Sequence, residues 1–285
     1  MLAEPTLRSD APQLPITLAV ITYNEQEQIA RCLDSVQFVS EKLVIDCGST
    51  DNTAEIAKKS GARVVYQPWL GFGKQRQFAT AQAQHDWVMM LDADESVSLE
   101  LHQECIRDLA KILENQHLGV IHVQRCTLYM GKPMRWYRPM RAESIARIYH
   151  RQRAHWNHAR VHESLVTKAR AAHLKAPLLH AHNPTLVHKQ LKVVRYAELK
   201  ALDWKAKNKP LRMWQCPLVF LLAFIKDYIF RLAILDGWRG FIVTQTAASY
   251  ALYKRMRYYE MRYNQESLPL AHKQLCKHLL ERDTQ

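Results

Sequence analysis

The chain has 285 residues, 48% of them hydrophobic and 24% charged, which is the composition of a folded protein with room for one large domain and an appendage. Its net charge of +13 is unevenly spread. Residues 1–100 hold 8 Lys/Arg and 14 Asp/Glu, a net of −6, whereas residues 101–285 hold 32 and 13, a net of +19. Such a basic part is typical of proteins with an anionic partner: nucleic acid, phospholipid or a phosphorylated substrate.

The cysteines and the N-terminus indicate a cytoplasmic protein. The six cysteines are scattered without a CxxC pair, which favours reduced thiols over a disulfide framework. The first residues, MLAEPTLRSDAPQLP, lack the apolar core of a signal peptide. No uncharged apolar run reaches the roughly 20 residues that a membrane span needs.

The first hundred residues predict alternating strands and helices. Continuous apolar runs predict buried strands at residues 16–22, 42–46, 63–67 and 87–91. Asn24 with Glu27 predicts a capping box for the first helix, Asp51 a cap for the second and Gly61 its end, and a third helix is expected at residues 74–84. The repeated unit predicts an α/β fold with a mostly parallel sheet and helices on both faces.

Polar residues follow three of these strands at the point where each ends. They are Thr22, Tyr23, Asn24 and Glu25 after the first, Asp46, Cys47, Gly48, Ser49, Thr50 and Asp51 after the second, and Asp92, Asp94 and Glu95 after the fourth. Ligands of open α/β sheets bind at the carboxyl ends of the strands, so we expect a binding site there. Capping and turn formation alone would not require three acids within four residues.

The sequence LDADES suggests two kinds of chemistry. The side chains of Asp92 and Asp94 point the same way on an extended segment, which suits one hard cation, Mg²⁺ or Mn²⁺, completed by a diphosphate. Two acids of separated pKa are the alternative; we favour the metal. No G-x-G-x-x-G and no phosphate loop of the form G-x-x-x-x-G-K-[ST] is present. GFGK (71–74) could help to hold a phosphate at a helix start or form a plain glycine turn.

Four motifs in order, TYNEQEQI, DCGSTDNT, GFGKQRQFA and LDADES, resemble family 2 glycosyltransferases, which have the GT-A fold. With WLGFGKQRQFA and DGWRGF (236–241), the chain looks most like bacterial enzymes of the lipopolysaccharide inner core, such as heptose β-1,4-glucosyltransferases. The resemblance implies a UDP-sugar donor, inverting transfer of a hexose, expected to be glucose, and a lipid-linked inner-core acceptor sugar, expected to be heptose.

The resemblance also implies roles for residues. The donor site would comprise Thr22, Tyr23, Asn24, Glu25, Asp46, Gly48, Ser49, Asp51, Arg76 and Asp92. Within it, Asp46 and Asp51 would hold uracil and ribose, and Asp92 would contact ribose or sugar. Asp94 would bind the metal, with His180, or its neighbour His182, as a further ligand. Glu95 would orient the metal shell or cap the following helix.

An inverting transfer needs a base, and acids are scarce in the basic part of the chain. Between residues 115 and 197 only Glu143 and Glu163 are acidic. A carboxylate within hydrogen-bond reach of the acceptor hydroxyl can take its proton, and we expect Glu163, in the strand-like VHESLV, to do so. The alternative for Glu163 is an ion pair with one of the nearby arginines.

The last hundred residues predict basic, partly apolar helices. A basic helix is expected at 189–209, and uncharged apolar runs occupy 213–225 and 241–253. Aromatic residues beside Lys and Arg favour an interfacial region on anionic lipid, at the cytoplasmic face of the inner membrane; a helical subdomain packed on the catalytic core is the alternative. We therefore divide the chain into a tail (1–14), a GT-A catalytic domain (15–185) and a C-terminal region (186–285).

Two rival functions remain from the sequence. A non-catalytic module that binds nucleic acid or membrane would use the basic charge and the aromatic residues, although the acids at the strand ends would repel phosphates unless a metal is bound; we expect no nucleic-acid partner. A metal-dependent nucleotide-sugar hydrolase or pyrophosphorylase would use the same strand ends without an acceptor.

Overall fold

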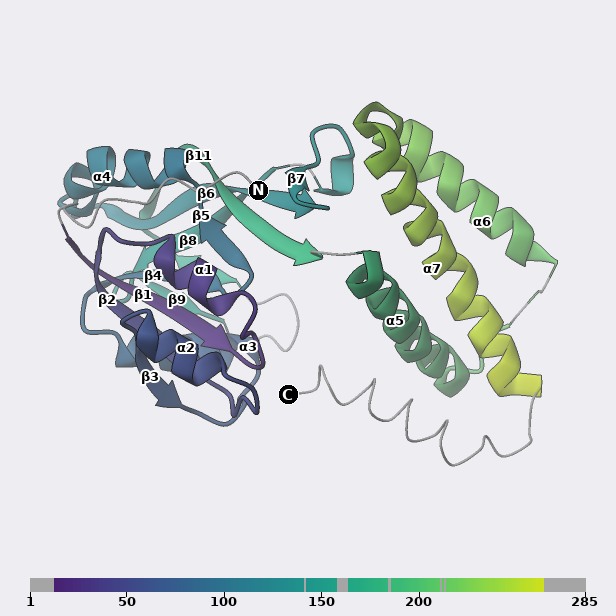
Figure 1. Cartoon of the computed structure of the whole chain (residues 1–285), viewed down its shortest axis with the longest axis horizontal. Helices are drawn as coiled ribbons and strands as arrows, with labels where there is room; N and C mark the ends of the chain where they lie inside the picture. Colours follow the sequence, from purple (N-terminus) through teal and green to yellow (C-terminus); the bar gives the residue numbers. More distant parts are fainter. Residues whose placement is uncertain are drawn as a thin grey trace. The chain divides into compact units, whose positions relative to one another are not determined.

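The computed structural model describes residues 13–140, 142–157, 164–183, 186–210, 212 and 214–263 (Figure 1). They form two compact units. The first comprises the residues up to Cys126 together with Ala142–His180, and the second comprises Thr127–Arg141 and the residues from Ala181 onward. The four motifs that carry the family resemblance lie in the first unit, and the predicted interfacial helices lie in the second.

The first unit begins with the predicted alternation of strands and helices. The strands are β1 (Leu14–Thr22), β2 (Val39–Asp46), β3 (Arg63–Tyr66) and β4 (Trp87–Asp92), and the helices between them are α1 (Ile29–Asp34), α2 (Thr53–Lys59) and α3 (Phe72–Gln82). These strands lie side by side in the order β3-β2-β1-β4, and every pair is parallel. Their carboxyl ends therefore meet at one edge, as the sequence predicted.

The sheet continues beyond β4 with strands whose described pairings are antiparallel. They follow in the order β8 (Glu143–His150), β6 (Leu118–Tyr129), β11 (Arg170–Asn183) and β5 (Glu95–Val97), with β7 (Lys132–Pro133) beside β6. The pairs β4–β8, β6–β8 and β5–β11 are antiparallel. The expectation of a mostly parallel sheet is thus wrong for the whole sheet. The described residues between β6 and β8 form no crossover helix of the kind that parallel neighbours need.

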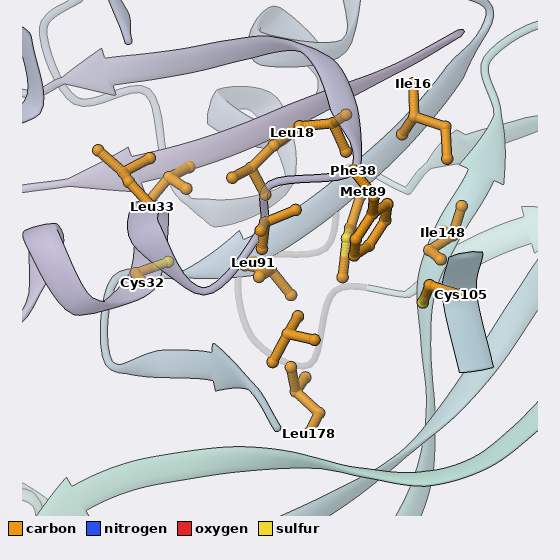
Figure 2. Packing of buried hydrophobic residues seen from close by; sticks show 14 of the residues in the cluster. Ile16, Leu18, Cys32, Leu33, Phe38, Met89, Leu91, Cys105, Ile148 and Leu178 are labelled. Carbon is orange, nitrogen blue, oxygen red and sulfur yellow. The ribbon is translucent and has the colours of Figure 1, made fainter. Parts of the chain in front are cut away.

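Helices cover both faces of this sheet, as predicted. Alternate residues of β1 point to opposite faces: Ile16 and Leu18 join the cluster beneath α1, α2 and α4 (Leu99–Leu113), whereas Ala19 joins the cluster beneath α3. Figure 2 shows the first of these clusters, where Leu33, Met89 and other residues pack together without exposure to solvent. This packing makes the strand ends a rigid frame.

Two predicted helix signals turned out differently. Helix α1 begins at Ile29, and Asn24 lies in the preceding loop with a φ of +54°, so the predicted capping box is wrong. Helix α2 has Asn52 rather than Asp51 as its N-cap residue, although Asp51 Oδ1 still accepts the backbone N–H of Thr53 at 3.0 Å. Gly61, at φ +80°, follows that helix as predicted.

The second unit is built around a long helix. Its elements are α5 (Leu186–Ala206), α6 (Gln215–Ile225), a π-helical turn η2 (Lys226–Phe230), a 3₁₀ turn η3 (Ala233–Asp236) and α7 (Gly237–Tyr263). Helix α7 packs against both α5 and α6. The segment from β6 through β7 and η1 (Arg138–Met140) packs on η3 and α7 through buried Tyr129, Met134 and Tyr137. Within the described part of the chain, no helix combines the length and hydropathy needed to cross a membrane.

A small two-stranded sheet completes the list of elements. Strands β9 (Ala154–Trp156) and β10 (Leu165–Thr167) pair antiparallel. The six residues between Asn157 and Ser164 lie outside the described residues, and with them the predicted base Glu163.

Candidate active site

The loops after β1 and β2 are joined by hydrogen bonds through Asn24. The backbone N–H of Asn24 donates to Ser49 Oγ at 2.9 Å, and its side-chain Oδ1 accepts the N–H of Thr50 at 2.8 Å. These two bonds explain the left-handed φ of Asn24, a conformation that asparagine tolerates better than most residues. The two predicted donor-binding loops are thus brought together and fixed against each other.

Asp46 organises the loop that follows β2. Its Oδ2 accepts the N–H groups of Gly48 and Ser49, each at 3.0 Å, and its Oδ1 accepts the Ser49 hydroxyl at 2.5 Å. Gly48 has a φ of +99°, which favours glycine at this turn. Asp46 therefore shapes the predicted nucleotide pocket with the same oxygens that would contact a base.

Asp51 plays a similar part between the two loops. Its Oδ2 accepts the N–H of Gln26 at 3.3 Å, and Oδ1 accepts both the N–H and the hydroxyl of Thr53. Partial burial raises the pKa of Asp51, but these hydrogen bonds outweigh it and the net pKa is lowered. Glu25 is tied to the same place, since its N–H donates to Thr53 Oγ1 at 2.8 Å.

Thr22 and Tyr23 lead from β1 into these loops. Thr22 is buried and its carbonyl accepts the N–H of Cys47 at 2.9 Å, whereas Tyr23 is half-buried. The Thr22 hydroxyl is buried without a hydrogen-bond partner among the described residues.

The acids at the end of β4 are held by two buried guanidinium groups. Arg76 Nη2 lies 2.7 Å from Asp92 Oδ1, and Arg147 Nη2 lies 2.9 Å from Asp92 Oδ2. The same Arg147 nitrogen lies 2.6 Å from Oε1 of Glu95, whose side chain is fully buried. The repulsion expected among closely spaced carboxylates is thereby offset by two positive charges. None of these three ion pairs was predicted. The sequence signal that could have indicated the contacts of Arg147 is the presence of an arginine inside the apolar strand sequence IARIY.

The two carboxylates respond differently to this environment. Burial raises the pKa of Asp92, but Arg147 and Arg76 outweigh it, so the net pKa is lowered and Asp92 is ionised. Burial dominates at Glu95 and raises its pKa in spite of Arg147. Glu95 lies in β5, and helix α4 is capped instead by Ser98 Oγ, which accepts the N–H of Leu101 at 3.1 Å. The capping alternative for Glu95 is therefore wrong.

The two predicted metal ligands lie together. Strand β5 pairs antiparallel with β11 so that Glu95 is opposite His180, which places the His180 ring next to Asp94. Nε2 of His180 lies 3.2 Å from Oδ2 of Asp94, and both side chains are only partly exposed. A carboxylate oxygen and an imidazole nitrogen at one point suit Mn²⁺ or Mg²⁺, which in nucleotide enzymes take one or two protein ligands and complete their shell with phosphate and water. The residues therefore fit the expected cation. No cluster of three or more His, Cys, Asp or Glu able to hold a metal occurs among the described residues.

Arg76 is also fixed from its other side. Its guanidinium carbon lies 4.8 Å from the ring centroid of Trp156, and Trp156 Nε1 donates to the hydroxyl of Tyr149 at 2.9 Å. The Tyr149 hydroxyl lies 2.6 Å from Thr80 Oγ1, one turn along α3 from Arg76. The ring and the ion pair together determine where Arg76 presents its charge.

Comparison with known proteins identifies the family of the chain. A family model described as glycosyl transferase family 2 matches residues 17–168. The chain belongs to this family. The resemblance carried by the four motifs is thus confirmed, and family membership makes the chain a nucleotide-sugar transferase.

Relatives extend the match over most of the chain. An uncharacterised glycosyltransferase of Rickettsia prowazekii is 28% identical over 239 residues, 80% of each chain. LpsC of Rhizobium meliloti, described as a lipopolysaccharide core biosynthesis glycosyltransferase, is 27% identical over 262 residues, 87% of this chain and 93% of its own. Among solved structures, S. aureus TarS 1–349 in complex with UDP is 17% identical with a TM-score of 0.44, covering 88% of this chain and 92% of its own.

Proposed function

We propose that this glycosyltransferase moves a hexose, glucose first among the candidates, from a UDP-sugar to a heptose of a lipid-linked lipopolysaccharide inner core. The similarity to LpsC over 87% of the chain supports the acceptor class. The observation that carries the donor side of the proposal is the Asp94–His180 pair, 3.2 Å apart beside the carboxyl end of β4. There it can face a diphosphate held by the loops after β1 and β2.

In this proposal Asp94 and His180 hold Mg²⁺ or Mn²⁺, which when bound neutralises the charge that builds on the departing nucleoside diphosphate. The protein's own groups position the donor. The hydrogen-bonded loops around Asn24, Asp46 and Asp51 surround the uridine, as the family resemblance implies. Each oxygen of Asp92 is ion-paired, one with Arg76 and the other with Arg147. We therefore assign Asp92 to orienting Arg76 and the neighbouring Asp94, in addition to the contact with the sugar.

The proton acceptor in the proposal is Glu163. The acceptor hydroxyl would lose its proton to this carboxylate while its oxygen attacks the anomeric carbon from the face opposite UDP, so the configuration inverts. The rival acid of the basic region, Glu143, is ion-paired with Arg125, and this pairing favours Glu163. A Glu163→Gln variant should keep donor affinity and lose transfer.

The experiment that tests this function measures donor binding first and transfer second. Thermal unfolding is followed with UDP-, GDP- and CMP-sugars, each with Mn²⁺, Mg²⁺ or EDTA; a ligand at a hundred times its dissociation constant should stabilise the protein by about 2.7 kcal/mol. One UDP-sugar should act, and only with metal. Asp94→Asn and His180→Ala should abolish that shift, whereas the control Asp108→Asn, in an exposed pair with Arg107, should not.

Product analysis then separates transfer from the rivals. Sugar attached to a heptose-containing acceptor supports the proposal, and sugar merely released would point to a hydrolase instead. A protein that binds no nucleotide sugar under any metal condition, but does bind oligonucleotide, would contradict the proposal and favour the non-catalytic module.

A further inference from the structure

The second unit exposes large apolar side chains on α6 and on the turns that lead into α7. Trp214, Leu218, Leu221 and Leu222 repeat at the spacing of one helix face and are 46–68% exposed. Phe230 in η2 and Trp238 at the start of α7 are 69% and 79% exposed. We call these six residues the α6–α7 surface. Such a concentration of exposed apolar side chains marks a site of interaction.

Aromatic contacts hold this surface together across three elements. The Phe241 ring of α7 lies 5.7 Å from both Trp238 and Phe224 of α6, measured between ring centroids. Phe224 in turn lies 5.1 Å from Tyr228 of η2. The exposed residues therefore belong to one packed body and not to separate loose segments.

The charges around the surface are mostly positive. Between residues 214 and 256 the acids are Asp227 and Asp236, and both are used inside the unit. Asp227 accepts the hydroxyl of Tyr137 and an N–H of Arg231, each at 3.0 Å. Asp236 accepts three backbone N–H groups of the segment after β7. Lys226, with a side chain 57% exposed, faces outward beside them.

We propose that the α6–α7 surface docks on an anionic phospholipid bilayer. Three leucines and Phe230 provide area to bury among the acyl chains, and the two highly exposed tryptophans suit the headgroup boundary, where such residues are enriched. Lys226, Arg231 and Arg239 supply the attraction to anionic headgroups. A second copy of the chain fits less well, because a twofold interface would bring Lys226, Arg231 and Arg239 of both copies together. Asp227, which is ion-paired with Lys226 and Arg231, offsets only part of that charge. This proposal rests on the proposed function, because a lipid-linked acceptor requires the enzyme to work at a membrane; it adds which surface of the protein would contact that membrane.

The test is vesicle flotation of the full chain, without donor. Vesicles contain equal parts of phosphatidylethanolamine and phosphatidylglycerol, and neutral vesicles replace the latter with phosphatidylcholine. We expect binding to the anionic vesicles, weakened by salt, with a blue shift of tryptophan emission that Trp214→Phe with Trp238→Phe removes. Leu221→Glu with Leu222→Glu should lower the affinity more than tenfold. Lys226→Gln should lower it about fivefold, the equivalent of ~1 kcal/mol per basic residue.

The matched control is Leu99→Glu, the same change at a leucine of the first unit that is 40% exposed; it should bind vesicles like the unaltered chain. Equal vesicle binding by the α6 double variant would overturn the proposal. So would conversion of a dimer to a monomer by that variant with unchanged vesicle binding, which would make a second copy the occupant. Donor binding is measured on the same proteins without lipid. Loss of the metal-dependent UDP-sugar shift with intact vesicle binding would contradict the proposed function and not this surface.

Discussion

Arg147 and Glu95 form an ion pair from which water is almost completely excluded. Their side chains are 6% and 0% exposed, and Nη2 lies 2.6 Å from Oε1. Glu95 Oε2 also accepts the backbone N–H of Asp92 at 3.3 Å. Arg147 therefore links strand β8 to the loop that carries Asp92 and Asp94, and it holds the loop from within the first unit.

Arg147→Met should both destabilise the protein and impair the donor site. Removing one partner of a buried pair leaves an uncompensated charge, at a cost of about 3–5 kcal/mol. Arg147→Lys keeps the charge, but the lysine side chain is about one atom shorter and its ammonium cannot reach the position from which Nη2 contacts both Asp92 and Glu95. We therefore expect a smaller loss of stability and still a weaker metal-dependent donor affinity. Urea unfolding and donor titration measure the two effects. Arg107→Met, at an exposed pair with Asp108, should leave the stability nearly unchanged, because solvent screens that pair; a similarly small effect at Arg147 would contradict the structural argument.

A second prediction concerns Glu41, far from the donor loops. Its carboxylate accepts the Thr17 hydroxyl at 2.6 Å, Arg63 Nη2 at 2.6 Å and the N–H of Gln84 at 2.8 Å. Burial raises the pKa of Glu41, but these hydrogen bonds outweigh it and the net pKa is lowered. The unfolded chain then binds the proton at higher pH than the folded protein. The stabilisation by Glu41 is present above the pKa of an unfolded glutamate and is lost as pH falls through the lower pKa of the folded state.

Glu41→Gln should accordingly cost about 2 kcal/mol at pH 7. The difference in urea midpoint between the unaltered protein and the variant should shrink as the pH falls below that of an ordinary glutamate. Glu55→Gln, at an exposed pair with Lys58, serves as the control: Lys58 lowers the pKa of Glu55 as well, but solvent screens this pair, so the difference in midpoint should be small at every pH. A constant difference across the pH range would mean that Glu41 does not titrate with folding.

A third prediction concerns Asp236, which fixes the segment after β7. Its oxygens accept the N–H groups of Arg135 at 3.0 Å, Trp136 at 3.1 Å and Tyr137 at 2.7 Å. Asp236→Ala should leave these donors to water and destabilise the second unit by about 2–3 kcal/mol. Hydrogen exchange of the three amides should accelerate, with little change at the amides of β1. Unchanged exchange would show that the segment is held by its apolar contacts with α7 instead.

These residues show where sequence was informative and where it was not. Local patterns were sufficient for β1 to β4, because each strand is a short apolar run ended by turn-forming residues, and the convergence of their polar ends follows from parallel pairing alone. The contact between Asp94 and His180 depends on the register of β5 and β11, which are separated by more than seventy residues. Pairing over that distance leaves no periodic trace. His180 was therefore placed at the site by family resemblance alone.

Arg147 and the segment around Asp236 were missed for related reasons. A buried arginine looks in sequence like a surface residue of a strand until its carboxylate partners are known. Nothing in residues 127–140 indicates that they pack with η3 and α7, since the acid that accepts the amides of Arg135, Trp136 and Tyr137 lies 99 to 101 residues away. The prediction of membrane contact depended on the basic and aromatic composition of the last hundred residues. The structure adds which apolar side chains of that region are exposed.

The last prediction tests the close packing beneath the α6–α7 surface. A Cβ added at Gly240 would overlap the carbonyl oxygen of Ala233 and lie 2.6 Å from its carbonyl carbon. Both atoms are backbone, so they cannot swing away as a side chain could. Gly240→Ala should therefore separate η3 from α7. We expect it to destabilise the second unit by several kcal/mol, which is at or above the usual cost of overpacking a core.

Gly61→Ala provides the contrast. Gly61 has a φ of +80° and open space around its Cα, so alanine there brings only backbone strain, about 1–2 kcal/mol. Thermal unfolding of both variants compares the cost of the backbone collision at Gly240 with the cost of the backbone strain at Gly61. If Gly240→Ala also weakens vesicle binding while the donor shift persists, then the packing of η3 on α7 is what presents Trp238 and its neighbours to the membrane. If Gly240→Ala costs no more than Gly61→Ala, the two backbones are not in contact in solution.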